Sequence, residues 1–321
     1  MKITILGAGA IGGNIAAHLA RGGLDVSVVA RGAHLAAIQA NGLRFTSPSV
    51  DFTVRLRATD RPEDLGPQDL VIATAKAHSL PAAVPGLKAL LGPETPVIYG
   101  INGVPWWYFH GHPNPAWAEK RIERLDPDGG LWDGIGIDRT IGCVLTSPMT
   151  VTAPGVVHCN WDKSSFMLGE PKGGLTPRLT GLVAALKPGL EGVDATADIR
   201  TAVWSKIILN LAGSSIGVLS ASTAGDIPAR PELKDLYRKI LEEGAAVAAG
   251  LGVSVSADFD GRMAAMMGTT HRASMLQDLE SGRPLELDAQ FDAVRDLARL
   301  AGVPTPVLDI LVPLLRMRAR Q

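Results

Sequence analysis

A lysine and an asparagine in the second half of the chain have the types and spacing of a proton-transfer site. Lys206 and Asn210 are one helical turn apart, so on a helix their side chains project from the same face. The residues around them are mostly apolar. Lys206 either extends its ammonium to solvent along its aliphatic stem or is held in a cleft, where loss of hydration would lower its pKa toward a range useful for general acid catalysis. The sequence leaves both readings open.

An acidic residue further along the chain is a second candidate for chemistry. Glu286 follows Gly282-Arg283-Pro284, a pattern that predicts a helix with proline in its first turn. A carboxylate at that end of a helix is stabilised by the helix dipole, so Glu286 has a structural explanation beside a functional one. Ser274, on the preceding predicted helix, is open to the same two explanations.

A glycine-rich turn near the N-terminus joins a short apolar run to a predicted helix. The run ends at Leu6 and is followed by Gly7-Ala8-Gly9-Ala10-Ile11-Gly12. Gly7 suits a tight turn, Gly9 allows a pyrophosphate to approach the backbone, and Gly12 allows the helix to pack closely on a sheet. The helix begins at Ala10 and Ile11, and its N-terminus offers an anion site. This context favours a dinucleotide-binding turn over a merely permissive glycine loop.

Two basic residues indicate which dinucleotide would bind. Arg31 ends the second predicted strand, where an NAD-preferring fold usually has an acidic residue for the ribose 2′-hydroxyl. A guanidinium instead binds a 2′-phosphate through charge-assisted hydrogen bonds, so NADP is favoured, although a surface arginine at a strand end is the alternative. Lys76 follows the next core strand and could add positive charge there, or be an ordinary solvated loop lysine.

Composition excludes several classes of protein. The chain has 321 residues, 46% of them hydrophobic, which is enough for two domains with separate cores. A formal net charge of −1 argues against nucleic acid or a membrane surface as the main partner.

No metal site is expected from the cysteines and histidines. The two cysteines, Cys143 and Cys159, form no disulfide framework or metal-ligand pattern, and no acidic residue or cysteine stands at metal-binding spacing from His110 and His112. No secretory or membrane-spanning segment is evident, and a cytoplasmic location is predicted.

The pattern of apolar residues predicts an α/β fold in two parts. Strands and helices alternate in the first part as in a doubly wound, Rossmann-type sheet, and residues 140–168 read as strands that extend it. The second part carries helical spacing throughout. We place the boundary at Gly192 and expect domains at 1–192 and 193–321. The predicted elements are strands at 25–30, 69–74 and 96–99, a hairpin of 43–46 with 52–56, and helices at 10–21, 33–40, 80–91, 175–185, 201–218, 232–249, 258–279, 284–301 and 307–318.

These residues together resemble one family along nearly the whole chain, the ketopantoate reductases (2-dehydropantoate 2-reductases). The resemblance implies NADPH-dependent reduction of the carbonyl of a 2-keto acid, with a Rossmann domain followed by an all-helical domain like that of 6-phosphogluconate dehydrogenases. It rests on the order and spacing of short blocks: Gly7 to Gly12, Arg31, Thr74-Ala75-Lys76-Ala77, Asn102-Gly103, Trp204-Ser205-Lys206 to Asn210, Ser274-Met275-Leu276-Gln277-Asp278 and Glu286-Leu287-Asp288.

The resemblance also implies roles for individual residues. Lys206 matches the lysine that hydrogen-bonds the substrate carbonyl and protonates the alkoxide as hydride arrives. Glu286 matches the acidic residue that binds the substrate hydroxyl and helps order the lysine, and it is counted among the cofactor contacts as well. Asn210 and Ser274 match substrate-binding positions, and Asn102 matches an asparagine between nicotinamide and substrate. Arg31 and Lys76 match the side chains that bind the NADP phosphate.

The chain departs from the family pattern in three places. Ser214 stands where the family commonly has a second asparagine, so one substrate hydrogen bond is shortened or lost. Ala289-Gln290-Phe291-Asp292 replaces a pattern of an aromatic residue followed by Asn-Gly. An aromatic-rich stretch runs from Trp106 to Trp132 beside the expected nicotinamide position. Those aromatic side chains either line a larger pocket or lid, or pack a segment onto the sheet or a second subunit.

Two other functions remain open beside reduction of ketopantoate. A relative could reduce a bulkier 2-oxo compound or act as an opine-type dehydrogenase, as the aromatic stretch and Ser214 suggest. A non-catalytic NADP-binding sensor would need neither Lys206 nor Glu286, so the presence of both argues against it. A homodimer is left open as well.

Overall fold

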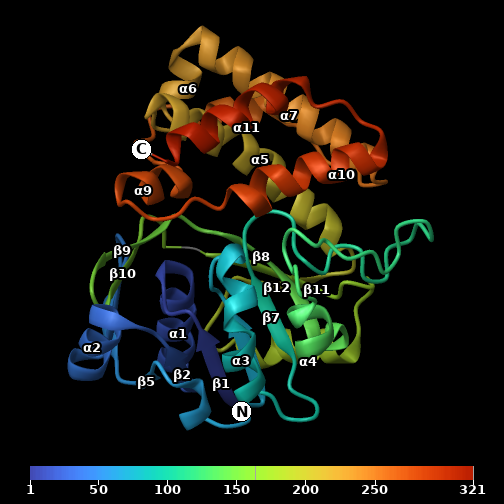
Figure 1. The fold of residues 1–321 in the computed structure, drawn as a ribbon. Helices are drawn as coiled ribbons and strands as arrows, with labels where there is room; N and C mark the ends of the chain where they lie inside the picture. The colour runs from blue at the N-terminus through green and yellow to red at the C-terminus, as the bar shows by residue number, and fades with distance from the viewer. Residues whose placement is uncertain (163, 321) are drawn as a thin grey trace. The chain divides into compact units, whose positions relative to one another are not determined.

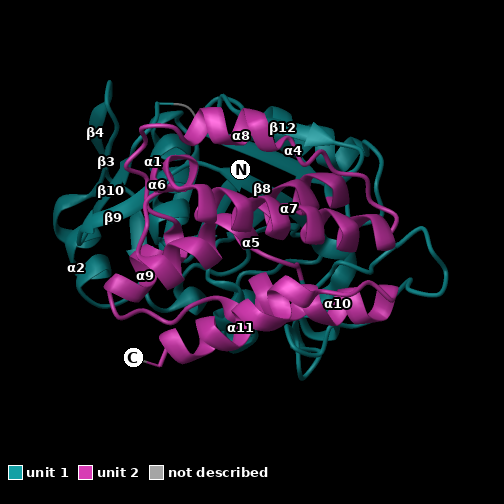
Figure 2. Cartoon of the chain, turned by 90° about the horizontal axis from the view of Figure 1, so that it is seen from above, with its two compact units in different colours: residues 1–101, 106–199 teal, residues 102–105, 200–321 magenta. Residues whose placement is uncertain are grey.

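The computed structural model describes residues 1–162 and 164–320 (Figure 1). Its Cα atoms group into two compact units, 1–101 with 106–199 and 102–105 with 200–321 (Figure 2). The first unit is an α/β unit and the second is helical, so the predicted fold class of a Rossmann-type part followed by a helical part is confirmed. The first unit includes the strand Val193–Thr196, whereas the predicted domain boundary at 192 precedes it. That boundary stays a prediction.

The first unit is built on an eight-stranded sheet of order β12-β11-β8-β7-β6-β1-β2-β5. All neighbours are parallel except β11 and β8. The order reverses between β1 and β6, which is where ligands bind in doubly wound sheets. The strands are β1 (Lys2–Leu6), β2 (Asp25–Val29), β5 (Arg57–Thr59), β6 (Leu70–Ala73), β7 (Val97–Gly100), β8 (Thr140–Thr146), β11 (Ser165–Gly169) and β12 (Val193–Thr196).

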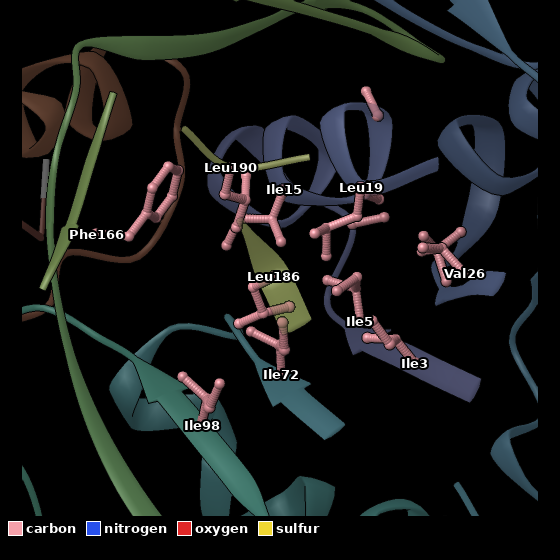
Figure 3. Close-up of a cluster of buried hydrophobic side chains, with 14 of the residues drawn as sticks. Ile3, Ile5, Ile15, Leu19, Val26, Ile72, Ile98, Phe166, Leu186 and Leu190 are labelled. Carbon is pink, nitrogen blue, oxygen red and sulfur yellow. The ribbon is translucent and has the colours of Figure 1, made fainter. Parts of the chain in front are cut away.

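One face of this sheet is covered by α1 (Ala10–Arg21) and α4 (Pro177–Leu186). Alternate residues of neighbouring strands, such as Ile5 and Ile72, meet Ile15 of α1 and Leu186 of α4 in a continuous apolar cluster (Figure 3). Each of these four side chains is at most 2% exposed. Because a parallel sheet is buried on both faces, its strands are apolar throughout, and this is the pattern that made them predictable. The remaining helices of this unit are α2 (Gly32–Asn41) and α3 (Leu80–Ala89).

A second sheet of four strands, in the order β4-β3-β10-β9, packs against α1. The His18 ring of α1 contacts the rings of Phe45 and Phe52 edge-on, with centroids 4.5 and 5.4 Å apart. The hairpin of β3 (Leu43–Thr46) and β4 (Asp51–Val54) is confirmed. Only part of the expectation for residues 140–168 holds: β8 and β11 extend the main sheet, but β9 (Met149–Ala153) and β10 (Val156–Cys159) join the hairpin, since β10 pairs with β3.

The aromatic segment 106–109 covers the opposite face of the main sheet. Trp106 packs edge-on against Tyr99 of β7, and Trp107 lies so close to Gly142 of β8 that a Cβ there would be 2.6 Å from the indole ring. Trp106, Trp107, Tyr108 and Phe109 are each at most 2% exposed. These four residues therefore pack the core of the first unit, the second of the two explanations given by the sequence.

The second unit contains helices from α5 onward, with two differences from the predicted pattern. Residues 258–279 form two helices separated by an extended segment, and the helix expected from 284 begins at Leu287 with a π-helical segment, Asp288–Asp292. The helices are α5 (Ile199–Ser220), α6 (Asp226–Ala229), α7 (Pro231–Gly250), α8 (Phe259–Met266), α9 (Ser274–Glu280), α10 (Ala293–Ala301) and α11 (Pro306–Arg318).

Among the described residues, α5 is the one helix long and apolar enough to cross a membrane by length and composition. In its 18-residue apolar window, 61% is buried inside the protein, and a mostly buried core helix passes the same test. The cytoplasmic location stays a prediction.

Candidate active site

The glycine turn after β1 has the geometry that its sequence predicts. Gly7 has φ +99°, a conformation that L side chains rarely adopt, and its N–H donates to the carbonyl of Val29 at the end of β2 (3.1 Å). A Cβ at Gly12 would lie 2.0 Å from the Gly7 oxygen and 2.4 Å from the Thr74 hydroxyl. That hydroxyl donates to the Gly7 carbonyl at 2.7 Å. The turn is therefore closed by packing that tolerates no side chain at Gly12.

The same turn leaves room on its open side. A Cβ at Gly9 would meet no atom within 4 Å, and α1 begins at Ala10 and Ile11 with neither a side-chain cap nor an acidic residue in its first turn. A helix N-terminus left in this state can receive an anion on its backbone N–H groups. The described residues of the turn therefore fit a dinucleotide pyrophosphate.

Two basic residues lie at the same edge of the main sheet. Arg31 is exposed and immediately precedes α2, just beyond β2, while half-buried Lys76 follows β6. Because β2 and β6 flank β1, all three strands end beside the glycine turn. The structure thus brings Arg31 and Lys76 to the edge on which Gly7, Gly9 and Gly12 lie.

In the second unit, α5 presents Lys206 and Asn210 one turn apart, both half-buried. Burial lowers the pKa of Lys206, and the positive charge of Arg262 lowers it further. The pKa of His271 is lowered by burial and then by the charge of Lys206. Lys206 is therefore substantially dehydrated rather than extended freely into solvent. Ser214, one turn beyond Asn210, is 4% exposed.

Glu286 lies at the start of the helical segment that leads into α10. Its backbone carbonyl accepts from Gln290 N (3.1 Å), while its side chain is 7% exposed. The Gln290 side-chain nitrogen lies 3.5 Å from Glu286 Oε2 as a donor. The helix begins later than Pro284 suggests, but Glu286 keeps its place at the positive end of the helix dipole.

Asn102 is tied to this segment through its neighbour. Gly103 has φ +81°, and a Cβ on it would lie 2.4 Å from the Ala289 carbonyl oxygen. Val104 N–H donates to the same oxygen at 2.8 Å. The N–H at the end of the π segment, that of Ala293, bonds to the carbonyl of Asp288. The segment that carries Glu286 therefore also holds the backbone beside Asn102.

Ser274 is exposed at the first residue of α9. The segment before it contains buried polar atoms, Thr269 Oγ1 and His271 Nδ1 among them, for which no hydrogen-bond partner is found within residues 1–162 and 164–320. Lys206, Asn210, Ser214, Ser274, Glu286 and Asn102 all belong to the second unit.

Sequence reasoning missed Gln290, Arg262 and His271 as neighbours of candidate residues. Gln290 stands four residues after Glu286, the same spacing that drew attention to Lys206 and Asn210, so its position could have been found from the sequence. Arg262 and His271 come from α8 and the extended segment after it, and no spacing in the sequence relates them to Lys206.

Comparison with known proteins finds relatives of the chain along nearly its whole length. The family model for ketopantoate reductase PanE/ApbA matches residues 3–172, and that for its C-terminal part matches residues 198–319. A 2-dehydropantoate 2-reductase of Mesorhizobium japonicum is 44% identical over 99% of this chain and 98% of its own. A crystal structure from Ralstonia solanacearum MolK2 has a TM-score of 0.90 at 35% identity and covers 99% of this chain and 98% of its own. A 2-dehydropantoate 2-reductase from Geobacter metallireducens GS-15 has a TM-score of 0.85 at 27% identity, covering 99% of both chains.

The fold and these matches define an oxidoreductase with a Rossmann-type part and a helical C-terminal part, of a class that uses NAD(P). The chain belongs to the ketopantoate reductase family.

We predict that Gly103→Ala lowers kcat/KM for the keto acid at least about tenfold, because the new Cβ must displace the Ala289 carbonyl and with it the backbone beside Asn102. Steady-state kinetics on the folded variant measure this. Gly252→Ala is the matched control: its φ of +78° imposes the same backbone penalty, but its Cβ would meet nothing within 4 Å. Equal kinetic losses in the two variants would contradict the assigned role of the Gly103 contact.

Proposed function

We propose that this protein reduces a 2-keto acid to the 2-hydroxy acid with NADPH, and that the acid is 2-dehydropantoate (ketopantoate), which becomes pantoate. The observation that carries the proposal is a dehydrated lysine on α5, Lys206, in a chain whose relative at 44% identity is named as a 2-dehydropantoate 2-reductase. A non-catalytic protein would have no use for such a lysine, whose burial works against its charge.

The choice of NADPH rests on Arg31. Its guanidinium is exposed at the sheet edge on which the glycine turn lies, and a guanidinium matches a phosphate through paired, charge-assisted hydrogen bonds. Lys76 adds a second positive charge after β6. When bound, the cofactor supplies the hydride that adds to the keto carbon.

A side chain of the protein then stabilises and neutralises the negative charge that develops on the substrate oxygen. The Lys206 ammonium donates a hydrogen bond to the carbonyl oxygen and transfers its proton to that oxygen as the C–O bond becomes single. The neutral amine that remains regains a proton from water. A cation placed at this oxygen stabilises the transition state more than the ground state, which is the requirement for catalysis. The lowered pKa of Lys206 makes this proton easier to give.

The remaining residues orient the substrate. In this proposal Asn210 and Asn102 donate hydrogen bonds from their amides, Ser274 binds the carboxylate end, and the buried carboxylate of Glu286 accepts from the substrate hydroxyl. Ser214 has a shorter side chain than the asparagine common in the family, and it is buried on the same helix.

A bulkier 2-oxo substrate is the alternative to ketopantoate. That alternative rests on the aromatic stretch from Trp106 to Trp132 and on Ser214, and the first four residues of the stretch, 106–109, are packed in the core of the first unit. The homodimer stays a prediction.

We expect Lys206→Met to lower kcat for ketopantoate reduction by about 10²–10⁴-fold, the usual contribution of a general acid, while NADPH still binds and the variant unfolds at the same or a higher temperature. A panel of 2-keto acids with NADPH absorbance as the readout measures activity, and NADPH fluorescence titration measures binding. If the unaltered protein binds NADPH but consumes it with no member of the panel, the protein is not the proposed reductase.

The Arg31→Ala variant should raise the KM for NADPH about ten- to a hundredfold and leave the KM for NADH nearly unchanged, since the lost hydrogen bonds involve only the 2′-phosphate. Kinetics with both cofactors test this. Arg55→Ala removes another exposed arginine of the first unit and serves as the control. If NADH supports the unaltered protein as well as NADPH does, the assignment of Arg31 fails.

The reaction should also depend on pH through Lys206. Reduction needs the protonated ammonium, so kcat/KM falls as pH rises through the pKa of Lys206, which lies below the ordinary value of 10.5. Arg262→Gln removes a positive charge that disfavours the ammonium, and the alkaline limb of the pH profile should move upward by about half a pH unit or less, because Arg262 is exposed. A downward shift would show that the limb reports another group.

A further inference from the structure

A cluster of ion pairs joins α11 to the π-helical segment Asp288–Asp292, and the proposed function gives this cluster no role. The guanidinium of Arg316, on α11, donates from Nη2 to Asp288 Oδ1 at 2.8 Å and to Asp292 Oδ2 at 2.5 Å. The two acids are the first and last residues of the segment. One nitrogen atom of α11 thus bridges the segment from end to end.

A second arginine binds on the other side of Asp292. Arg295, on α10, has Nη1 3.6 Å from Asp292 Oδ1, and its Nε donates to Asp309 Oδ1 at 2.7 Å. Asp309 lies in the first turn of α11 and Arg316 in its last turn, about two turns apart. Because α11 is attached at two separate points, it cannot slide or rotate against the segment without breaking an ion pair.

The carboxylates of Asp288 and Asp292 are held close together by their shared donor. Asp292 is 7% exposed, so water screens its charge poorly. Like charges four residues apart on a helix repel each other and destabilise it. A π-helical turn is also rare in proteins and is frequent at functional sites. Loss of the Arg316 guanidinium would therefore remove the cation between the two carboxylates and drive the ends of the segment apart.

The carbonyl of Ala289, between these two acids, connects the segment to the candidate site. It accepts from Val104 N–H at 2.8 Å, and a Cβ on Gly103 would lie 2.4 Å from it. Asn102 directly precedes Gly103 in the chain. A change in the spacing of the two acids therefore moves the carbonyl to which the backbone beside Asn102 is hydrogen-bonded.

We infer that Arg316 is a positioning residue: by bridging Asp288 and Asp292 it holds the Ala289 carbonyl in place and so sets the position of Asn102 for the substrate. The inference rests on the proposed function, in which Asn102 donates a hydrogen bond to the substrate. Arg316 acts only through the backbone and takes no part in hydride or proton transfer. A displacement of about 1 Å, caused far from the reacting atoms, can lower the rate about 10²-fold.

The first test is the activity of two variants at Arg316. Arg316→Met keeps an unbranched side chain and removes the cation, and it should lower kcat/KM for ketopantoate about tenfold or more in protein that is fully folded by circular dichroism. Arg316→Lys should retain kcat/KM to within about threefold of the unaltered protein, because one nitrogen makes both bonds and an ammonium has three donors. Equal losses in the two variants would overturn the inference.

Removal of one of the two negative charges gives a signature that loss of packing cannot produce. Asp292→Asn combined with Arg316→Met should have a kcat/KM several-fold higher than that of Arg316→Met alone, because the repulsion across the segment is relieved. The effects of the two substitutions are then non-additive. If Asp292→Asn leaves the loss unchanged or deepens it, the charge bridge is not what positions the site.

Arg299→Met is the matched control. It removes another arginine of the second unit, whose Nη1 donates to Asp296 Oδ1 at 2.6 Å on α10. This variant should change kcat/KM for ketopantoate less than about threefold. A loss as large as that of Arg316→Met would show that any broken ion pair in the helical unit has the same effect, and the inference would fail.

Hydrogen exchange at the amide of Val104 separates this inference from the proposed function, because it needs no substrate. Measured by NMR on the free protein, this amide should exchange about tenfold or more faster in Arg316→Met than in the unaltered protein or in Arg299→Met. If the protein reduces no 2-keto acid but exchange responds in this way, the proposed function fails while the link from Arg316 to the backbone beside Asn102 is supported. Unchanged exchange at Val104 in Arg316→Met overturns the inference whether or not the protein is active.

Discussion

The arrangement of the candidate site depends on one carbonyl oxygen, that of Ala289. It accepts from Val104 N–H at 2.8 Å and lies where any Cβ on Gly103 would collide with it. In the same segment the N–H of Ala293 bonds to the carbonyl of Asp288, five residues back, which is the spacing of a π helix. The hydrogen bond from Val104 and the close approach of Gly103 thus meet at one carbonyl inside the π-helical segment. It joins the segment of Asn102 to the segment of Glu286.

The site also concentrates charge that the fold would be more stable without. Lys206 is dehydrated, and the neighbouring charge of Arg262 adds repulsion, so the folded protein binds the lysine proton less tightly than the unfolded chain does. Between the lowered pKa and 10.5 the unfolded chain carries more protons, and the contribution of Lys206 to the free energy of unfolding therefore rises with pH across that window. A loss of stability of this kind, from burying a charged lysine, is expected where a group acts on a substrate rather than supporting the fold.

The sequence predicted those elements whose physical cause is local. The α1 helix, the strands β1, β2 and β6, and the conformation of Gly7 follow from apolar runs and glycines at short spacing, and they were placed within about a residue. The prediction of a single helix at 258–279 was wrong. The helix is interrupted before Ser274, where the backbone bonds to a distant segment instead: Ala224 N–H donates to the carbonyl of His271 at 2.8 Å. The pairing of β10 with β3 could not be read from the sequence for the same reason.

Sequence reasoning proposed Lys206, Glu286 and Asn102 as site residues but did not predict their neighbours. In the sequence, Ala289-Gln290-Phe291-Asp292 after Asp288 is a departure from the family pattern to which no role was assigned. In three dimensions each substituted position is used: the Ala289 carbonyl receives Val104, Phe291 is fully buried, and Asp292 pairs with Arg316. Gln290 is then the one member of the four whose side chain faces the candidate carboxylate. A local departure from a pattern therefore carries information about the site only when the partner of each substituted group is known.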